Sequence, residues 1–142
     1  FTLAHSLTLG LSTLGWIALR SPPVEAMIAL SILLVAGAAL NKEQTLSRRW
    51  PALVAPLFGL VHGLGFAGAL QQIGLPQNHL LLALLTFNLG VEVGQLAIVL
   101  AALGVLHLMR RFAKAAEMPL LKLATYAIGI TASFWFIERT FA

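Results

Sequence analysis

Three ionisable side chains lie well inside long apolar stretches of this sequence: His5, His62 and Glu92. A hydrocarbon interior makes every ionisable group costly, so such residues are functional candidates wherever a stretch crosses a membrane. Two imidazoles and one carboxylate suit a borderline divalent transition metal such as nickel, cobalt, zinc or iron. Hard cations favour more oxygen ligands, and Cu(I) favours sulfur. The same groups could instead relay protons, and two histidines could hold a haem, so the residue types leave several chemistries open.

Glu92 lies on a polar stripe with two amide side chains. Asn88, Glu92 and Gln95 are spaced i, i+4, i+7, which places them within roughly 60° of one another on a helix. Gly90 and Gly94 form a GxxxG pair on the opposite face, where small residues let another helix approach. Hydrogen bonding between helices explains Asn88 and Gln95, but a neutral glutamine would do that work without a titratable group. The spacing therefore favours a functional Glu92, with Asn88 and Gln95 as supporting polar residues.

His62 lies in a stretch that is rich in glycine and follows a proline. Gly59 and Gly63 form a second GxxxG pair, Gly65 follows closely, and Pro56 removes one helical hydrogen bond. This pattern predicts a kinked or partly unwound helix, which membrane proteins tolerate where the backbone lines a cavity. The alternative is a glycine-rich packing face with His62 hydrogen-bonded to a neighbour. The spacing does not choose between the two.

His5 lies among hydroxyl side chains, with Thr2, Ser6 and Thr8 close by in the sequence. Such hydroxyls often bond to a carbonyl of their own helix, so they are weak indicators of a site. Ser6 adjoins His5, but neighbouring side chains on a helix point about 100° apart, and no nucleophile-elbow pattern is present. We therefore predict no catalytic residue here, and treat Ser6 as a supporting polar group.

Five apolar segments must position these residues. The chain has 142 residues, of which 59% are hydrophobic and 10% charged, and its mean hydropathy is +0.91. This composition excludes a disordered tail, a nucleic-acid-binding domain and an ordinary soluble enzyme. Each segment approaches the ~20 apolar residues that span a bilayer, and period-2 alternation is absent. The sequence predicts one all-α transmembrane helical bundle of about five spanning helices, over 1–19, 24–41, 52–72, 80–107 and 119–141.

The positive charges gather on alternate connections between these segments. Seven of the nine Lys and Arg residues fall in the 42–51 loop, in the 108–118 loop or just beyond it, and only Arg20 and Arg139 lie on the other side. This asymmetry predicts that both loops are cytoplasmic and that the C-terminus lies outside. Neither loop holds four adjacent basic residues, so we read the charges as topology signals rather than as a nucleic-acid or lipid-headgroup site. The absence of Cys excludes disulfides and thiolate metal sites.

Four motifs, met in order along the chain, resemble the HupE/UreJ family of hydrogenase and urease accessory membrane proteins, and its second, broader branch in particular. They are FTLAHSLTL at 1–9, PVEAMIALSI at 23–32, FGLVHGLGFA at 58–67 and FNLGVEVGQL at 87–96. The resemblance implies a polytopic bacterial inner-membrane protein, in several cases associated with nickel supply. It also implicates His5, His62 and Glu92. Glu25 falls in the second motif, near the predicted outer edge, as an interfacial charge or one at which ions enter.

One expected part of the family pattern is missing. Members of the family usually have a preceding membrane helix with an HxxxGxDH pattern, whereas this chain begins at Phe1 and contains no Asp. The expectation is an N-terminally trimmed fragment with its upstream helix outside the sequence.

These residues and the resemblance together predict a membrane permease or accessory protein for divalent transition-metal ions, with nickel favoured and cobalt, zinc or iron as alternatives. His5, His62 and Glu92 would hold the ion near the middle of the membrane. The partners would be the lipid bilayer, the metal ion and a second copy of the chain, with no nucleic acid. The competing hypotheses are a metal- or haem-binding membrane enzyme or redox module, and a structural assembly subunit.

Overall fold

The computed structural model describes residues 1–41, 43–74 and 77–141, and within them every regular element is a helix. This confirms the predicted all-α class. The elements are α1 (Thr2–Thr13), α2 (Ser21–Leu40), α3 (Leu46–Arg49), α4 (Pro51–Ile73), the short 3-10 helix η1 (Gln77–His79), α5 (Leu80–Phe112) and α6 (Lys114–Phe141).

The first predicted segment, 1–19, is shorter than expected because α1 ends at Thr13. Gly15 adopts a φ of +78°, a left-handed conformation that L side chains rarely take. The N–H of Trp16 donates to the Leu11 carbonyl at 3.0 Å, which closes a Schellman-type cap. A helix of 12 residues is about 18 Å long, short of the ~30 Å hydrocarbon layer. In the described chain four helices, rather than the five expected, are long and apolar enough to span a membrane: α2, α4, α5 and α6.

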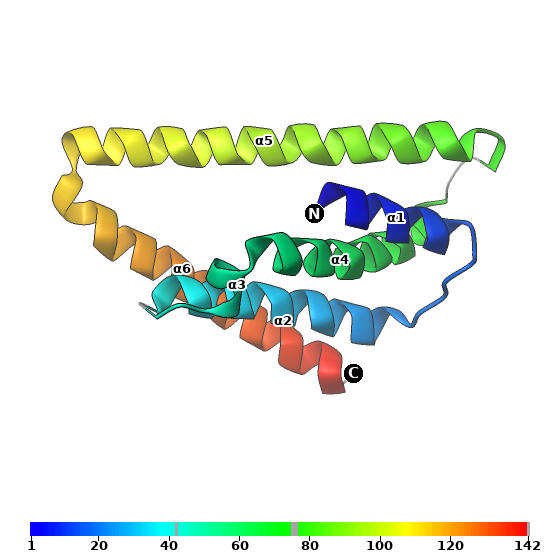
Figure 1. Cartoon of the computed structure of the whole chain (residues 1–142), viewed down its shortest axis with the longest axis horizontal. Helices are drawn as coiled ribbons and strands as arrows, with labels where there is room; N and C mark the ends of the chain where they lie inside the picture. Colours follow the sequence, from blue (N-terminus) through cyan, green and yellow to red (C-terminus); the bar gives the residue numbers. More distant parts are fainter. Residues whose placement is uncertain (42, 75–76, 142) are drawn as a thin grey trace.

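The bundle is built around α4. Figure 1 shows α1 and α2 beside α4, with α6 crossing behind α2. Alanines supply most of the buried face of α2, which lets its neighbours approach closely. Leu9, Ala67 and Leu70 form a small buried core between α1 and α4, and Leu84 and Phe87 of α5 pack against it.

Three glycines of α4 make close contacts with neighbouring helices. A Cβ at Gly59 would meet the Phe1 carbonyl oxygen, and a Cβ at Gly63 would meet the carbonyl oxygen of His5. Gly65 faces the Ile28 side chain of α2 in the same way. These three glycines therefore lie where α4 packs closely against α1 and α2.

The predicted partial unwinding of this stretch is wrong. The α-helix runs without interruption from Pro51 to Ile73, through both Pro56 and His62. Pro56 lies within the first two turns, where its missing N–H costs the helix one early hydrogen bond. The glycines therefore serve close packing rather than an opened backbone.

Helix α5 is the least buried of the long helices in the described chain. Its 33 residues make a rod about 50 Å long, which lies along one side of the bundle in Figure 1. It packs on α1 and α6, and no residue of its described length is fully buried. A Cβ at Gly90 or at Gly94 would meet no described atom within 4 Å. The predicted close-packing face of this segment is therefore open within the chain.

Candidate metal site

His5 is a buried imidazole without hydrogen bonds. Its side chain sits on α1 with 1% exposure, and neither ring nitrogen has a partner among the described residues. The ring stacks on Phe1 with centroids 5.8 Å apart, and meets the edge of Phe66 at 5.4 Å. Buried polar atoms are nearly always hydrogen-bonded, so two unpartnered ring nitrogens call for a ligand or a further donor. A metal ion would satisfy the lone pair of a neutral imidazole.

His62 faces the same aromatic ring from the neighbouring helix. Its Nδ1 lies 2.8 Å from the Phe58 carbonyl oxygen, one turn earlier on α4. Since a carbonyl only accepts, Nδ1 must carry the proton, and the lone pair of the neutral ring is then on Nε2. A metal-binding histidine is commonly oriented by such a bond from its other nitrogen. The ring of His62 lies 5.4 Å from that of Phe1.

The close approach of α1 and α4 brings the two histidines together. Gly63 leaves room for the backbone of His5, and the hydroxyl of Thr8 donates to the Leu60 carbonyl at 2.8 Å. This bond ties the two helices together within one turn of the site. The rings of His5 and His62 both contact the Phe1 ring.

Ser6 and Asn88 link α1 to α5. The Ser6 hydroxyl donates to Asn88 Oδ1 at 2.8 Å, and Asn88 Nδ2 donates to the Leu84 carbonyl at 2.9 Å. Both side chains are partly buried. Ser6 and Asn88, the two predicted supporting residues, therefore hydrogen-bond to each other between α1 and α5. This bond fixes the position of α5 along α1.

Glu92 and Gln95 lie further along α5 and are exposed. Figure 1 shows α1 below the first half of α5. Among the described residues no group of three or more His, Cys, Asp or Glu side chains gathers at one point. The structure brings together His5 and His62, and it holds Glu92 apart from them.

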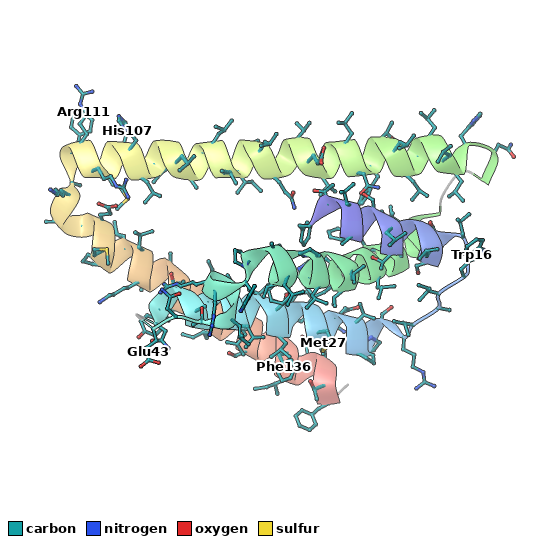
Figure 2. All side chains as sticks on the ribbon, viewed as in Figure 1. Trp16, Met27, Glu43, His107, Arg111 and Phe136 are labelled. Carbon is teal, nitrogen blue, oxygen red and sulfur yellow. The ribbon has the colours of Figure 1, made fainter. Side chains whose placement is uncertain are left out.

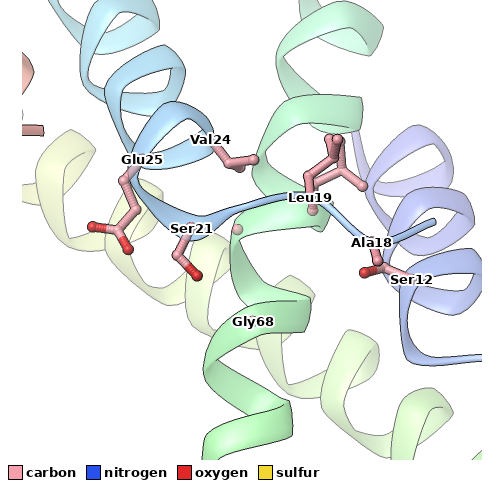
Figure 3. Close-up of a pocket in the computed structure, with 9 residues that line it drawn as sticks. Ser12, Ala18, Leu19, Ser21, Val24, Glu25 and Gly68 are labelled. Carbon is pink, nitrogen blue, oxygen red and sulfur yellow. The ribbon is translucent and has the colours of Figure 1, made fainter. Parts of the chain in front are cut away.

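Glu25 belongs to a different part of the molecule. Its Oε2 lies 2.8 Å from Nε of Arg139 on α6. Nε makes no hydrogen bond, so the N–H does not point at the carboxylate and the contact is an ion pair alone. Figure 3 shows Glu25 and Ser21 beside a cavity of about 290 Å³, with Ser12 of α1 on the opposite side.

Sequence reasoning missed the aromatic rings around the histidines and the arginine opposite Glu25. Phe1 and Phe58 each precede a histidine by four residues. On a helix this spacing places the ring or the backbone carbonyl of the phenylalanine beside the imidazole of the histidine. That spacing could have indicated both contacts. Arg139 lies 114 positions from Glu25 in the chain, and nothing local links the two.

The four long apolar helices are those of a multi-pass helical membrane protein, with His5 buried and His62 half-buried. A family model described as "HupE / UreJ protein" matches residues 1–139, so the chain belongs to the HupE/UreJ family. This confirms the resemblance carried by the four motifs. The family is linked to nickel or cobalt handling, in accessory or transport functions. No curated protein and no solved structure matches the chain.

Proposed function

We propose that this protein is a permease or accessory protein for divalent transition-metal ions, with Ni²⁺ the favoured ion and Co²⁺, Zn²⁺ or Fe²⁺ the alternatives. The observation that carries the proposal is the buried imidazole of His5, with both ring nitrogens unpartnered. His62, oriented by its bond to Phe58, supplies a second imidazole from the adjacent helix. Two imidazoles favour a borderline metal over Mg²⁺ or Ca²⁺.

Glu92 is the third proposed ligand, and it would have to approach the histidines. The Ser6–Asn88 bond holds α5 against α1 only one turn from Glu92, and α5 is otherwise loosely packed. A carboxylate exposed within an apolar helix is costly in hydrocarbon, so a bound cation would lower that cost. A two-histidine site that gains its carboxylate from a movable helix can both bind and release an ion, as transport requires.

We also propose the orientation that the basic loops predict, in a bacterial inner membrane. In Figure 1 the loop that carries α3 and the turn between α5 and α6 lie toward one end of the bundle, and the α1–α2 connection and η1 lie toward the other. Figure 2 shows Arg111 and His107 pointing outward at the first of these ends. The clustering of positive charge at one end supports cytoplasmic loops at 42–51 and 108–118, with the C-terminus outside. Lys42, one of the seven basic residues, lies outside the described residues.

The test is metal accumulation in cells that express the full-length protein. His62→Ala and Glu92→Gln should each abolish Ni²⁺-dependent accumulation, whereas His107→Ala, an exposed histidine on α5, should leave it intact. Accumulation should also weaken as the pH falls, because protons compete with the metal for imidazole and carboxylate. Normal accumulation in both His62→Ala and Glu92→Gln, at normal expression, would remove the proposed site.

A further inference from the structure

Two apolar grooves meet at a basic pocket between α2 and α4. The basic pocket, of about 420 Å³, is lined by Arg48 and Ser47 of α3 and by Phe58 of α4. The α6-side groove, of about 410 Å³, shares Phe58 and Ala39 with this pocket. The α3-side groove, of about 620 Å³, shares Phe58 and Ala38 with it. Each groove therefore continues from the basic pocket along a different face of α2.

Both grooves have mostly apolar walls that open to the surroundings. Their wall residues Leu34, Val35 and Leu57 are each about half exposed. The wall of the α6-side groove runs over 31–39 of α2, and that of the α3-side groove over 33–41, a rise of about 12 Å in each case. One leaflet of a bilayer offers roughly 15 Å of hydrocarbon, half of the ~30 Å core. Two grooves of this length that meet at one end suit the two acyl chains of a phospholipid.

The basic pocket holds a positive charge without a carboxylate partner. Among the described residues no carboxylate pairs with the exposed Arg48. Its Nη1 donates to the backbone carbonyl of Glu43 at 3.5 Å, a long and therefore weak hydrogen bond. The hydroxyls of Ser47 and Thr45 lie 3.1 Å apart, and both residues line the α3-side groove. A guanidinium binds a phosphate through two parallel N–H groups, and hydroxyls can donate to its other oxygens.

Two tryptophans mark where the bilayer surfaces meet the molecule. Trp50 follows α3 directly and is 56% exposed, and Trp16 lies in the connection between α1 and α2 and is 77% exposed. Tryptophan gathers at both interfaces of a membrane, and Figure 1 shows these two regions toward opposite ends of the bundle. Arg48, two residues from Trp50, is therefore at the level of the lipid headgroups, and the grooves run from it toward the middle of the membrane.

We infer that the basic pocket and the two grooves bind one anionic phospholipid, with its phosphate on Arg48 and Ser47 and one acyl chain in each groove. Basic pockets between membrane helices recognise anionic headgroups in this way. An acyl chain exchanges one hydrocarbon surrounding for another when it enters a groove, so the charge of the headgroup decides which lipid binds.

This inference goes beyond the proposed function and does not need the metal site. The sequence shows the basic residues of the 42–51 loop only as topology signals. The packing of α2, α4 and α6 adds the grooves that lead to Arg48. The α6-side groove also reaches His62, so a lipid bound there lies beside the candidate metal site. The two sites are tested by different measurements.

Lipid binding to the full-length protein in detergent, followed by native mass spectrometry, tests the inference. The probes are phosphatidylglycerol, which is anionic, and phosphatidylcholine, which is zwitterionic, with identical acyl chains. Phosphatidylglycerol should bind about fivefold more tightly, the gain expected from one basic residue at the membrane surface. Equal affinity for the two lipids is what an ordinary surrounding lipid would show, and it would overturn the inference.

Substitution of the arginine separates a built site from general surface charge. Arg48→Gln should abolish the preference for phosphatidylglycerol, whereas Arg48→Lys keeps the charge and should keep most of it. Arg111→Gln is the matched control, because Arg111 is exposed and lines neither the pocket nor a groove. It should retain the full preference. A preference that survives Arg48→Gln, or that Arg111→Gln removes equally, would overturn the assignment to Arg48.

Filling the grooves tests whether acyl chains occupy them. A Cβ at Gly37, in the α3-side groove, meets no described atom within 4 Å. Gly37→Phe should therefore leave the fold intact and weaken phosphatidylglycerol binding at least about fivefold. Ala39→Phe, at an exposed position of the α6-side groove, should do the same. Gly104→Phe, at an equally open glycine of α5, is the matched control and should bind the lipid normally, with circular dichroism confirming the helical content of all three.

A free phosphate compound is the alternative occupant of the basic pocket. Glycerol 3-phosphate carries the phosphate without acyl chains and should not displace phosphatidylglycerol at equal concentration. Displacement by glycerol 3-phosphate would identify a site for a soluble phosphate and overturn the lipid. Normal phosphatidylglycerol binding in both Gly37→Phe and Ala39→Phe would likewise overturn it, because the acyl chains would then lie elsewhere.

Discussion

Helices α4 and α5 carry the same GxxxG spacing and use it differently. At Gly63 of α4 the backbone of His5 occupies the space that a side chain would fill, whereas at Gly94 of α5 that space is empty. On α4 the close contact seats one histidine beside another, and on α5 the neighbouring carboxylate is left exposed. A small-residue spacing therefore permits close packing, and the neighbouring helix decides whether it occurs.

A leucine at Gly63 and one at Gly94 should affect stability very differently. Gly63→Leu should destabilise the protein by about 3 kcal/mol, because the new side chain overlaps the backbone of α1. Gly94→Leu should stay within about 1 kcal/mol of the original, since it meets open space and leucine is the better helix former. Both are measured by thermal unfolding in detergent micelles. An equal loss at Gly94 would show that another segment or a second copy covers that face of α5.

Metal-induced stabilisation tests whether α5 joins the site. Ni²⁺ at a hundred times its dissociation constant should stabilise the folded protein by about 2.7 kcal/mol. His62→Ala and Glu92→Gln should each lose most of this gain, and His107→Ala should retain it. The measurement is the change in melting temperature on adding Ni²⁺, with Mg²⁺ as the ionic-strength control. Full stabilisation of Glu92→Gln would confine the site to α1 and α4.

The smallest expected effect concerns the bond that couples the two regions. Ser6→Ala removes the donor to Asn88, and side-chain hydrogen bonds between membrane helices contribute about 0.6 kcal/mol on average. Hydrogen exchange of the α5 amides near Asn88 should quicken, while that of α4 should not. Thr13→Ala is the control, since its hydroxyl bonds only within α1. Unchanged exchange in Ser6→Ala would show that apolar contacts at Leu84 and Phe87 suffice to hold α5.

Much of the architecture followed from local pattern. The apolar segments predicted the four long helices. In lipid a segment of about twenty apolar residues can hydrogen-bond its own backbone groups only as a helix. The exception was the first run, where Gly15 ended α1 early through its left-handed backbone. The pattern of hydrophobic residues does not indicate such a helix cap, because hydrophobic residues continue beyond it in the sequence.

The candidate site was predicted in part. His5 and His62 were selected as rare ionisable groups in apolar sequence, and the structure places both beside Phe1. The predicted unwinding near His62 did not occur, because the glycines that weaken an isolated helix also let α1 pack tightly enough to support it. The third residue, Glu92, was selected by the same argument, yet its surroundings depend on how α5 is held.

The sequence by itself determined the class of protein, the family and the few side chains that could bind a metal, since composition, motif order and residue chemistry are properties of the chain alone. Only the tertiary structure decided which of those side chains meet. His5 and His62 lie 57 positions apart, and Glu25 and Arg139 twice as far. Contacts over such separations arise from the fit of whole helix surfaces, here glycine against backbone, and no local pattern contains both surfaces.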